Sequence, residues 1–171
     1  MKKILAVCLC VFSLGGCVSY DNYYRLDDDY LSRRQMETMR FDTNDEATIL
    51  SASAGVLQDL GFTLDETETK LGLITAYKNR AATSTGAKAA IILLSAMDGS
   101  QPVYDTEQKI YTTLVTTKGK NSGGYNVRIS FARMITNNLH ETRNEEIDDP
   151  KIYREFFDKL SQSLFLTAHE I

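Results

Sequence analysis

The sequence predicts an α+β domain, with an antiparallel sheet and helices packed on one face in the order β-α-β-β-α-β-β-α. Apolar residues alternate with polar ones along two long segments within residues 109–131, as expected for half-buried strands. Two other segments repeat apolar residues every three or four positions, as amphipathic helices do. Short polar stretches separate these segments, which favours antiparallel pairing of neighbours. The 171 residues suffice for one domain that needs neither a metal nor a disulfide.

Residues 36–42 predict the first strand, with Met39 and Phe41 on one face. Residues 43–46 (TNDE) match a capping box, in which the Thr43 hydroxyl and the Glu46 side chain satisfy each other's backbone amides. The following helix is expected to end at Gly61 in the left-handed conformation. Its buried stripe is expected to contain five residues at helical spacing: Leu50, Ser53, Val56, Leu57 and Leu60.

Residues 62–65 and 73–77 predict two strands joined by a polar turn that contains Gly72. A polar break at residues 79–86 precedes an apolar segment, residues 87–97 (AKAAIILLSAM), which begins at Ala87 and ends at Met97. Nine of its eleven residues are apolar, as in a helix or a buried strand, and the alanines favour the helix. Residues 98–102, with their glycine and proline, are expected to end it.

Residues 109–118 predict a long strand rich in β-branched residues, and residues 125–131 predict its antiparallel partner. The glycine-rich residues 119–124 are expected to join the two as a hairpin loop. Asp149 and Pro150 are suited to the N-cap and first position of the last helix. Its buried face is expected to contain Tyr153, Phe156, Phe157, Leu160 and Leu164.

The N-terminus has the features of an export signal. Lys2 and Lys3 precede an apolar run at residues 4–14 (ILAVCLCVFSL), and two glycines follow it. At 1.5 Å per helical residue the run covers about 16 Å, whereas the hydrocarbon core of a membrane is about 30 Å thick. The run is therefore too short to span a membrane and is typical of a signal peptide.

Residues 14–17 (LGGC) resemble the lipobox of bacterial lipoproteins, in which small residues precede an obligatory cysteine. The resemblance implies cleavage before Cys17, a diacylglyceryl group on its thiol and acylation of its amine, with palmitate as an expected acyl group. Residues 1–16 would then be the signal peptide, residues 17–35 a lipidated tether and residues 36–171 the domain. Val18, where an Asp would favour inner-membrane retention, implies the outer membrane, with the domain facing the periplasm. The alternatives are an ordinary signal peptide and a buried apolar helix.

Cysteine usage and charge are consistent with this location. Cys8, Cys10 and Cys17 are the three cysteines, so the mature chain would hold no disulfide and no free thiol nucleophile. The net charge is −4, and loss of Lys2 and Lys3 with the signal peptide would make it −6. An acidic chain argues against a nucleic-acid partner, because binding phosphates requires a basic surface.

The predicted tether contains four tyrosines, Tyr20, Tyr23, Tyr24 and Tyr30. They favour an arm that packs on its own domain, and the alternative is a contact strip for a protein partner or the lipid headgroups. The acidic residues 27–29 lack the ligand spacing of a calcium loop, so a solvated charge run is the simpler interpretation.

The sequence predicts no enzyme, no cofactor and no metal site. His140 and His169 lie far apart, without a second ligand at helical spacing, and no nucleophile or phosphate-loop motif occurs. The loop with Lys118, Lys120, Gly123 and Gly124 could cradle an anion, but a hairpin connector explains the same residues. Four acidic residues ahead of the last helix, at positions 145, 146, 148 and 149, suggest either a cation site or, more simply, stabilisation of the helix dipole.

These features predict a non-enzymatic, lipid-anchored envelope protein that serves as an accessory or interaction subunit of an outer-membrane or periplasmic assembly. The element order and the anchor loosely resemble the helix-grip domains of the lipoprotein C subunit of the outer-membrane β-barrel assembly machine. The alternatives are a small-ligand or lipid-binding module, with its groove between sheet and helices, and an envelope hydrolase.

The apolar segment 87–97 is the element with the clearest functional hypothesis. It is expected either to pack on the domain core, which is the favoured interpretation, or to contact a protein partner, another copy or the membrane surface.

Overall fold

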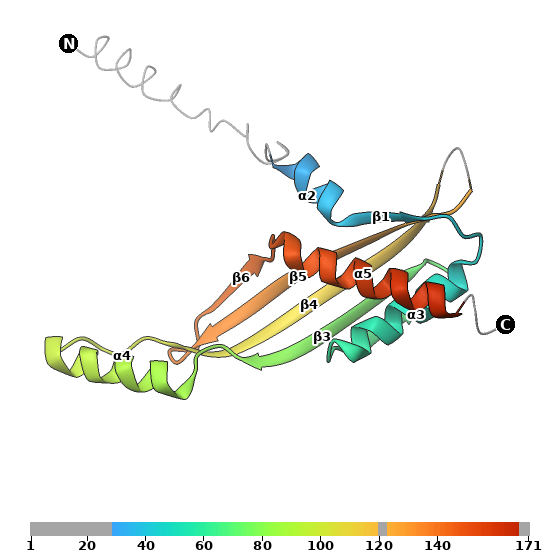
Figure 1. Cartoon of the computed structure of the whole chain (residues 1–171). Helices are drawn as coiled ribbons and strands as arrows, with labels where there is room; N and C mark the ends of the chain where they lie inside the picture. The colour runs from blue at the N-terminus through green and yellow to red at the C-terminus, as the bar shows by residue number, and fades with distance from the viewer. Residues whose placement is uncertain (1–28, 120–122, 168–171) are drawn as a thin grey trace, which may run out of the picture. The chain divides into compact units, whose positions relative to one another are not determined.

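Among the residues that the computed structural model describes, 29–119 and 123–167, six strands form one antiparallel sheet (Figure 1). The strand order is β1-β5-β4-β3-β2, and β6 also pairs with β5. The predicted α+β class with an antiparallel sheet is confirmed. The strands are β1 (Thr38–Phe41), β2 (Thr63–Glu68), β3 (Leu73–Ala81), β4 (Asp105–Lys118), β5 (Tyr125–Asn137) and β6 (Thr142–Glu146).

Two helices, α3 (Glu46–Asp59) and α5 (Pro150–Thr167), cover one face of this sheet (Figure 1). The strand register places Ile74, Leu114 and Ile129 side by side on that face, and all three are fully buried. This is the alternation predicted from the sequence. The core between sheet and helices is formed by Ile49, Leu50, Val56, Leu57, Ile74, Ala76, Leu114, Val127, Ile129, Phe131, Tyr153, Phe156, Phe157 and Leu160.

The start of α3 differs from the prediction. The N-cap is Asp45, whose carboxylate accepts hydrogen bonds from the Thr48 amide (3.1 Å) and the Thr48 hydroxyl (2.6 Å). The predicted capping box of Thr43 and Glu46 is wrong, because the Glu46 carboxylate instead accepts a hydrogen bond from the buried hydroxyl of Thr116 on β4. The first turn of α3 is thereby tied to the sheet.

The end of α3 is as predicted. Gly61 has φ +82°, its amide donates to the Gln58 carbonyl (2.8 Å), and the Phe62 amide donates to the Leu57 carbonyl (2.9 Å). These two bonds are the Schellman arrangement, which satisfies carbonyls that the last helical turn leaves free. The chain then turns directly into β2, so α3 stays against the sheet.

The start of α5 also agrees with the prediction. The Asp149 carboxylate accepts a hydrogen bond from the Lys151 amide (3.0 Å), as an N-cap does, and Pro150 occupies the first position. Tyr153 packs edge-on against Phe131, with ring centroids 5.4 Å apart, and its hydroxyl donates to the Ile147 carbonyl (2.7 Å). Burial raises the pKa of Tyr153 to about 12, so the phenol stays a donor at neutral pH.

Two elements were not predicted. Helix α2 (Tyr30–Met36) lies at the end of the predicted tether, residues 17–35, and includes Met36, which was predicted to begin the first strand. Met36 packs against the core, and Arg33 pairs with Glu146 and Asp148. The five residues of β6 are all polar, so no apolar alternation marked the strand.

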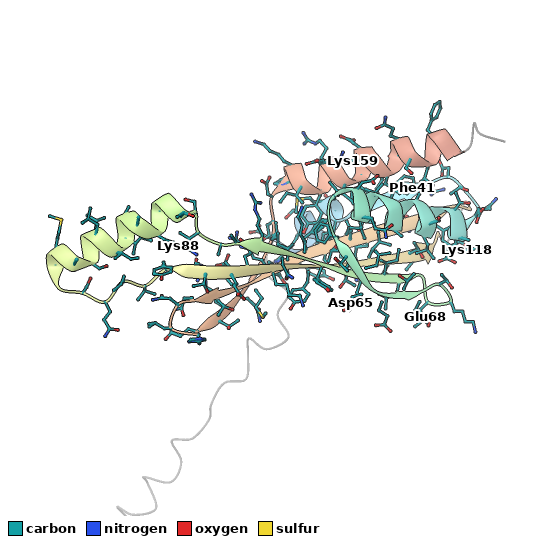
Figure 2. All side chains as sticks on the ribbon, turned by 90° about the horizontal axis from the view of Figure 1, so that it is seen from below. Phe41, Asp65, Glu68, Lys88, Lys118 and Lys159 are labelled. Carbon is teal, nitrogen blue, oxygen red and sulfur yellow. The ribbon has the colours of Figure 1, made fainter. Side chains whose placement is uncertain are left out.

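The remaining helix, α4 (Thr85–Asp98), lies away from α3 and α5 and extends past the end of the sheet (Figure 1). The predicted packing of all helices on one face is therefore wrong for α4. No residue of α4 belongs to the core cluster found among the described residues. The view with side chains shows the same separation from a direction at right angles (Figure 2).

Candidate functional site: the α4 arm

Residues 82–104, hereafter the α4 arm, leave the sheet at the end of β3, form α4 and return to the start of β4. Ser84 caps the helix by accepting a hydrogen bond from the Ala87 amide (3.3 Å), and Gly99 ends it with φ +75°. After the helix, the Asp98 carboxylate accepts a hydrogen bond from the Ser100 amide (2.8 Å), and hydrogen bonds from the side chain and the amide of Ser100 lower the pKa of Asp98. Both ends of α4 are thus defined by local hydrogen bonds.

The base of the arm is fixed to the turn between β5 and β6. The Asn138 side chain donates to the Pro102 carbonyl (2.8 Å) and accepts from the Tyr104 amide (3.0 Å). Arg143 on β6 donates to both oxygens of Asp105, the first residue of β4, at 2.7 Å each. The arm therefore projects from a rigid base.

The charged groups at this base form an ion-pair cluster. Arg143 also donates to Glu145 (2.9 Å), and Arg133 on β5 donates to the same carboxylate (2.7 Å). The hydrogen bonds from Arg143 hold the pKa of Asp105 and of Glu145 below their ordinary values. Both carboxylates are charged at neutral pH, which maintains the cluster.

One side of α4 faces the returning chain, which runs alongside the helix in both views (Figures 1 and 2). Lys88 lies over the ring of Tyr104, with its Nζ 5.7 Å from the ring centroid. Ser95 is buried and Ile91 is partly buried, and both lie at helical spacing from Lys88. We call this side, with Lys88, Ile91 and Ser95, the inner face.

The opposite side of α4 is apolar and exposed. The exposed fractions are 65% for Leu93, 64% for Leu94 and 80% for Met97. Between residues 85 and 98 the charged residues are Lys88 on the inner face and Asp98 at the end of the helix. We define the outer face as Gly86, Ala89, Ala90, Leu93, Leu94 and Met97.

The favoured prediction for residues 87–97, packing on the core, is therefore wrong. The helix itself was predicted correctly, but the sheet face that would receive it is already covered by α3 and α5 (Figure 1). Isolated exposed apolar residues are ordinary, whereas a contiguous apolar patch is typical of contact surfaces. None of the helices in the described part of the chain is long and apolar enough to cross a membrane.

The loop expected either to connect β4 and β5 or to cradle an anion has the geometry of a hairpin connector. Gly123 and Gly124 have φ +71° and +77°, and the Gly119 amide donates to the Gly124 carbonyl (3.0 Å). A Cβ on Gly124 would lie 2.5 Å from the Phe41 carbonyl oxygen, so glycine lets β1 approach this turn. Lys118 ends β4, and Lys120 lies outside the described residues.

The acidic residues ahead of α5 do not form a single cluster, because Glu146 and Asp148 share Arg33 whereas Glu145 and Asp149 have other partners. Glu145 and Glu146 bind different arginines, and Asp149 caps the helix. His140 lies exposed in the turn after β5 with φ +65°. In residues 29–119 and 123–167, no three His, Cys, Asp or Glu side chains are grouped so that they could hold a metal ion.

Several predicted residues lie outside the described part of the chain: His169, Cys17, and Tyr20, Tyr23 and Tyr24 of the tether.

The core side chains pack between the sheet and the two helices, where the alternative hypothesis places a ligand groove. Two shallow hollows instead lie along the sheet face that α3 and α5 leave open. One of about 560 Å³ is bordered by α2, Val115 and Arg128, and one of about 500 Å³ by Asn79, Lys109 and Met134. Between them on this face, Lys109 places its Nζ 4.2 Å from the ring centroid of Tyr77 and 4.9 Å from that of Tyr111.

The sequence predicts the apolar segment but not the contacts that hold the base of the α4 arm. Asn138, Tyr104 and Arg143 hold the base of the arm through contacts between residues up to 38 positions apart. No local sequence pattern predicts hydrogen bonds between residues that lie so far apart in the chain. The proline and the asparagine pair at residues 102 and 137–138 only indicate turns.

No protein-family model matches the chain, and no curated protein matches it significantly.

Proposed function

We propose that this is a non-enzymatic, lipid-anchored protein of the bacterial envelope that acts by binding, with the α4 arm as its contact element. It would serve as an accessory or interaction subunit of an outer-membrane or periplasmic assembly. The observation that carries the proposal is the exposed apolar outer face of α4, held on a rigid base at the end of the sheet.

The lipid anchor rests on the residues around Cys17. Two lysines, a short apolar run and two glycines precede this cysteine at the spacing of a lipobox. One acyl chain binds a membrane only marginally, whereas two or three hold a protein stably. Confinement to a membrane raises the effective concentration of the arm near partners in the same envelope, so a small contact surface suffices.

The anchor is tested by metabolic labelling with palmitate. We expect the wild-type protein to incorporate label and to begin at Cys17 by intact mass, and Cys17→Ala to incorporate none. Cys10→Ala is the matched control, because Cys10 lies in the predicted signal peptide, and it should label like the wild type. Equal labelling of Cys17→Ala and the wild type would refute the anchor.

The contact role of α4 is tested by a photo-crosslinking amino acid at position 93 in living cells. Leu71, in the turn between β2 and β3, is 70% exposed and supplies a control position of similar exposure. We expect a crosslinked protein adduct from position 93 and none from position 71. Absence of any adduct at position 93 would show that the arm has no protein contact.

A small-ligand or lipid-binding module is the second candidate. The hollows on the open sheet face favour it, since volumes of about 500 Å³ lie in the range of small-molecule sites. Native mass spectrometry separates the two candidates. A co-purified small molecule of defined mass would support the ligand module, and an unliganded protein would count against it.

A further inference from the structure

The side chains on the outer face of α4 become larger from the start of the helix to its end. Its first half carries Gly86, Ala89 and Ala90, whereas its second half carries Leu93, Leu94 and Met97. Gly86, Ala90, Leu93 and Met97 are spaced four, three and four residues apart, which puts them on one side of the helix. This side lies opposite Ser95 on the inner face.

We infer that the outer face of α4 binds the outer face of α4 in a second copy of the chain, with the two helices antiparallel. A two-fold axis between residues 91 and 92 would place Met97 of one copy opposite Gly86 of the other, and Leu93 opposite Ala90. The same axis pairs Leu94 with Ala89. Every large side chain then faces a small residue, which is the complementarity that close packing requires.

A parallel pair lacks this fit. It would set Leu93 against Leu93 and Met97 against Met97, and would leave glycine and alanine facing each other across a gap. The antiparallel pair also brings Asp98 of one copy to the N-terminal end of α4 in the other, where a negative charge is favourable. An isologous contact of this kind closes on itself and makes a dimer.

The area of the outer face agrees with a dimer. The exposed fractions of Leu93, Leu94 and Met97 correspond to roughly 400 Å² of apolar surface, and the exposed glycine and two alanines add to it. Complete burial of this surface in a pair would remove about 800–1,200 Å² from water, which is the size of a small interface.

The charges on α4 favour a second copy over the membrane as the occupant. Helices that lie in a membrane surface carry a basic polar face beside the apolar one. Helix α4 has one basic residue, Lys88, and it lies over Tyr104, so the helix lacks the row of free basic side chains that binds lipid headgroups.

Sedimentation velocity on the full chain purified from membranes tests the inference. We expect a dimer for the wild type and a dissociation constant raised by roughly 100-fold in Leu93→Glu, because a charge would enter the centre of an apolar interface. Leu71→Glu is the matched control and should remain dimeric. A wild-type monomer at every concentration up to about 100 μM, or a dimer unaffected by Leu93→Glu, would overturn the inference.

The antiparallel register is tested with single cysteines. When Ala90→Cys and Leu93→Cys proteins are mixed and oxidised, we expect disulfide-linked heterodimers in excess of either homodimer. An excess of homodimers would indicate the parallel pair and would contradict the proposed register.

The membrane alternative has its own readout. The chain contains no tryptophan, so Leu93→Trp supplies a single reporter. With vesicles that carry brominated acyl chains we expect no quenching of this tryptophan beyond that of Leu71→Trp. Stronger quenching at position 93 would assign the face to lipid and overturn the dimer.

The inference deepens the proposed contact role of α4 and is independent of the anchor. Palmitate labelling of Cys17 reports on the anchor alone, and crosslinking of position 93 to a different protein would preserve the contact role while refuting the dimer.

Discussion

Truncation of one leucine in α3 and one in α4 should have very different effects on stability. Leu57 in α3 is fully buried in the core, whereas Leu93 in α4 is 65% exposed. Both lie inside a 14-residue helix, so the substitutions Leu57→Ala and Leu93→Ala make the same chemical change in the same kind of local structure. The difference between them measures tertiary packing.

The expected magnitudes follow from burial. Leu57→Ala removes three buried carbon atoms at about 0.8 kcal/mol each and leaves a cavity, so the free energy of unfolding should fall by about 3 kcal/mol. Leu93→Ala removes atoms that are mostly in water already, and alanine is the slightly better helix former. Its effect should stay within about 0.5 kcal/mol.

Urea unfolding followed by circular dichroism measures both changes. With a slope of about 2 kcal/mol per molar, the midpoint of Leu57→Ala should fall by about 1.5 M and that of Leu93→Ala should hardly move. The protein is kept dilute so that association through α4 adds nothing to stability. A loss for Leu93→Ala as large as that for Leu57→Ala would refute the reasoning, because α4 would then belong to the core.

Three further predictions concern the scaffold. Gly124→Ala should lower the free energy of unfolding in urea by about 2 kcal/mol or more, because the φ of Gly124 is +77° and a Cβ there would meet a carbonyl of β1. Gly55→Ala in α3 should instead raise it by about 0.5–1 kcal/mol, because a Cβ at position 55 has open space around it. Tyr153→Phe should cost about 1–2 kcal/mol in the same assay, since the Ile147 carbonyl loses its donor; an unchanged midpoint would contradict that bond. Arg143→Gln should lower the melting temperature at pH 7, and this deficit should shrink as the pH falls below the ordinary pKa of an aspartate. Because the pKa of Asp105 is lowered in the folded protein, its ion pair stabilises the fold fully above the ordinary pKa, and this stabilisation is lost as the pH falls through the lowered pKa. A deficit in melting temperature of Arg143→Gln that is the same at pH 7 and pH 3 would exclude this pair as the cause.

The elements that the sequence predicts well are those that bury a single stripe. Helix α5 repeats its aromatic and leucine residues at helical spacing, and β5 alternates from Tyr125 to Phe131, so burial on one face leaves a clear period. Two helix ends are also predictable from the sequence, because Gly61 at the end of α3 and Pro150 at the start of α5 have strong local preferences. In these parts local pattern and tertiary packing agree.

The strand β6 could not be predicted, because its stabilisation comes from across the sheet. Its residues are polar, and it is held by the pairing of Glu145 with Arg133 and of Arg143 with Asp105. These partners lie 12 and 38 residues away in the sequence, so no local period reports them. The same residues were interpreted as an acidic run before a helix.

The position of α4 could not be predicted for the opposite reason. Its residues are apolar on nearly every side of the helix, so the pattern predicts that α4 is buried but does not indicate which element it packs against. Only the structure shows that α3 and α5 cover one face of the sheet and that α4 extends past the end of the sheet. The candidate site was therefore recognisable as an unusual segment, whereas its exposure was not.

The accessibility of position 93 in intact cells tests the proposed contact role of α4 most directly. Leu93→Cys and the control Leu71→Cys are treated with a water-soluble maleimide, once as dilute purified protein and once in intact cells. Similar rates at the two positions are expected in the purified protein, where both side chains are about two-thirds exposed. In cells we expect position 93 to react at least about 10-fold more slowly than position 71, because a bound surface excludes the reagent. Equal rates in cells would mean that nothing covers the arm and would contradict its role as the contact element.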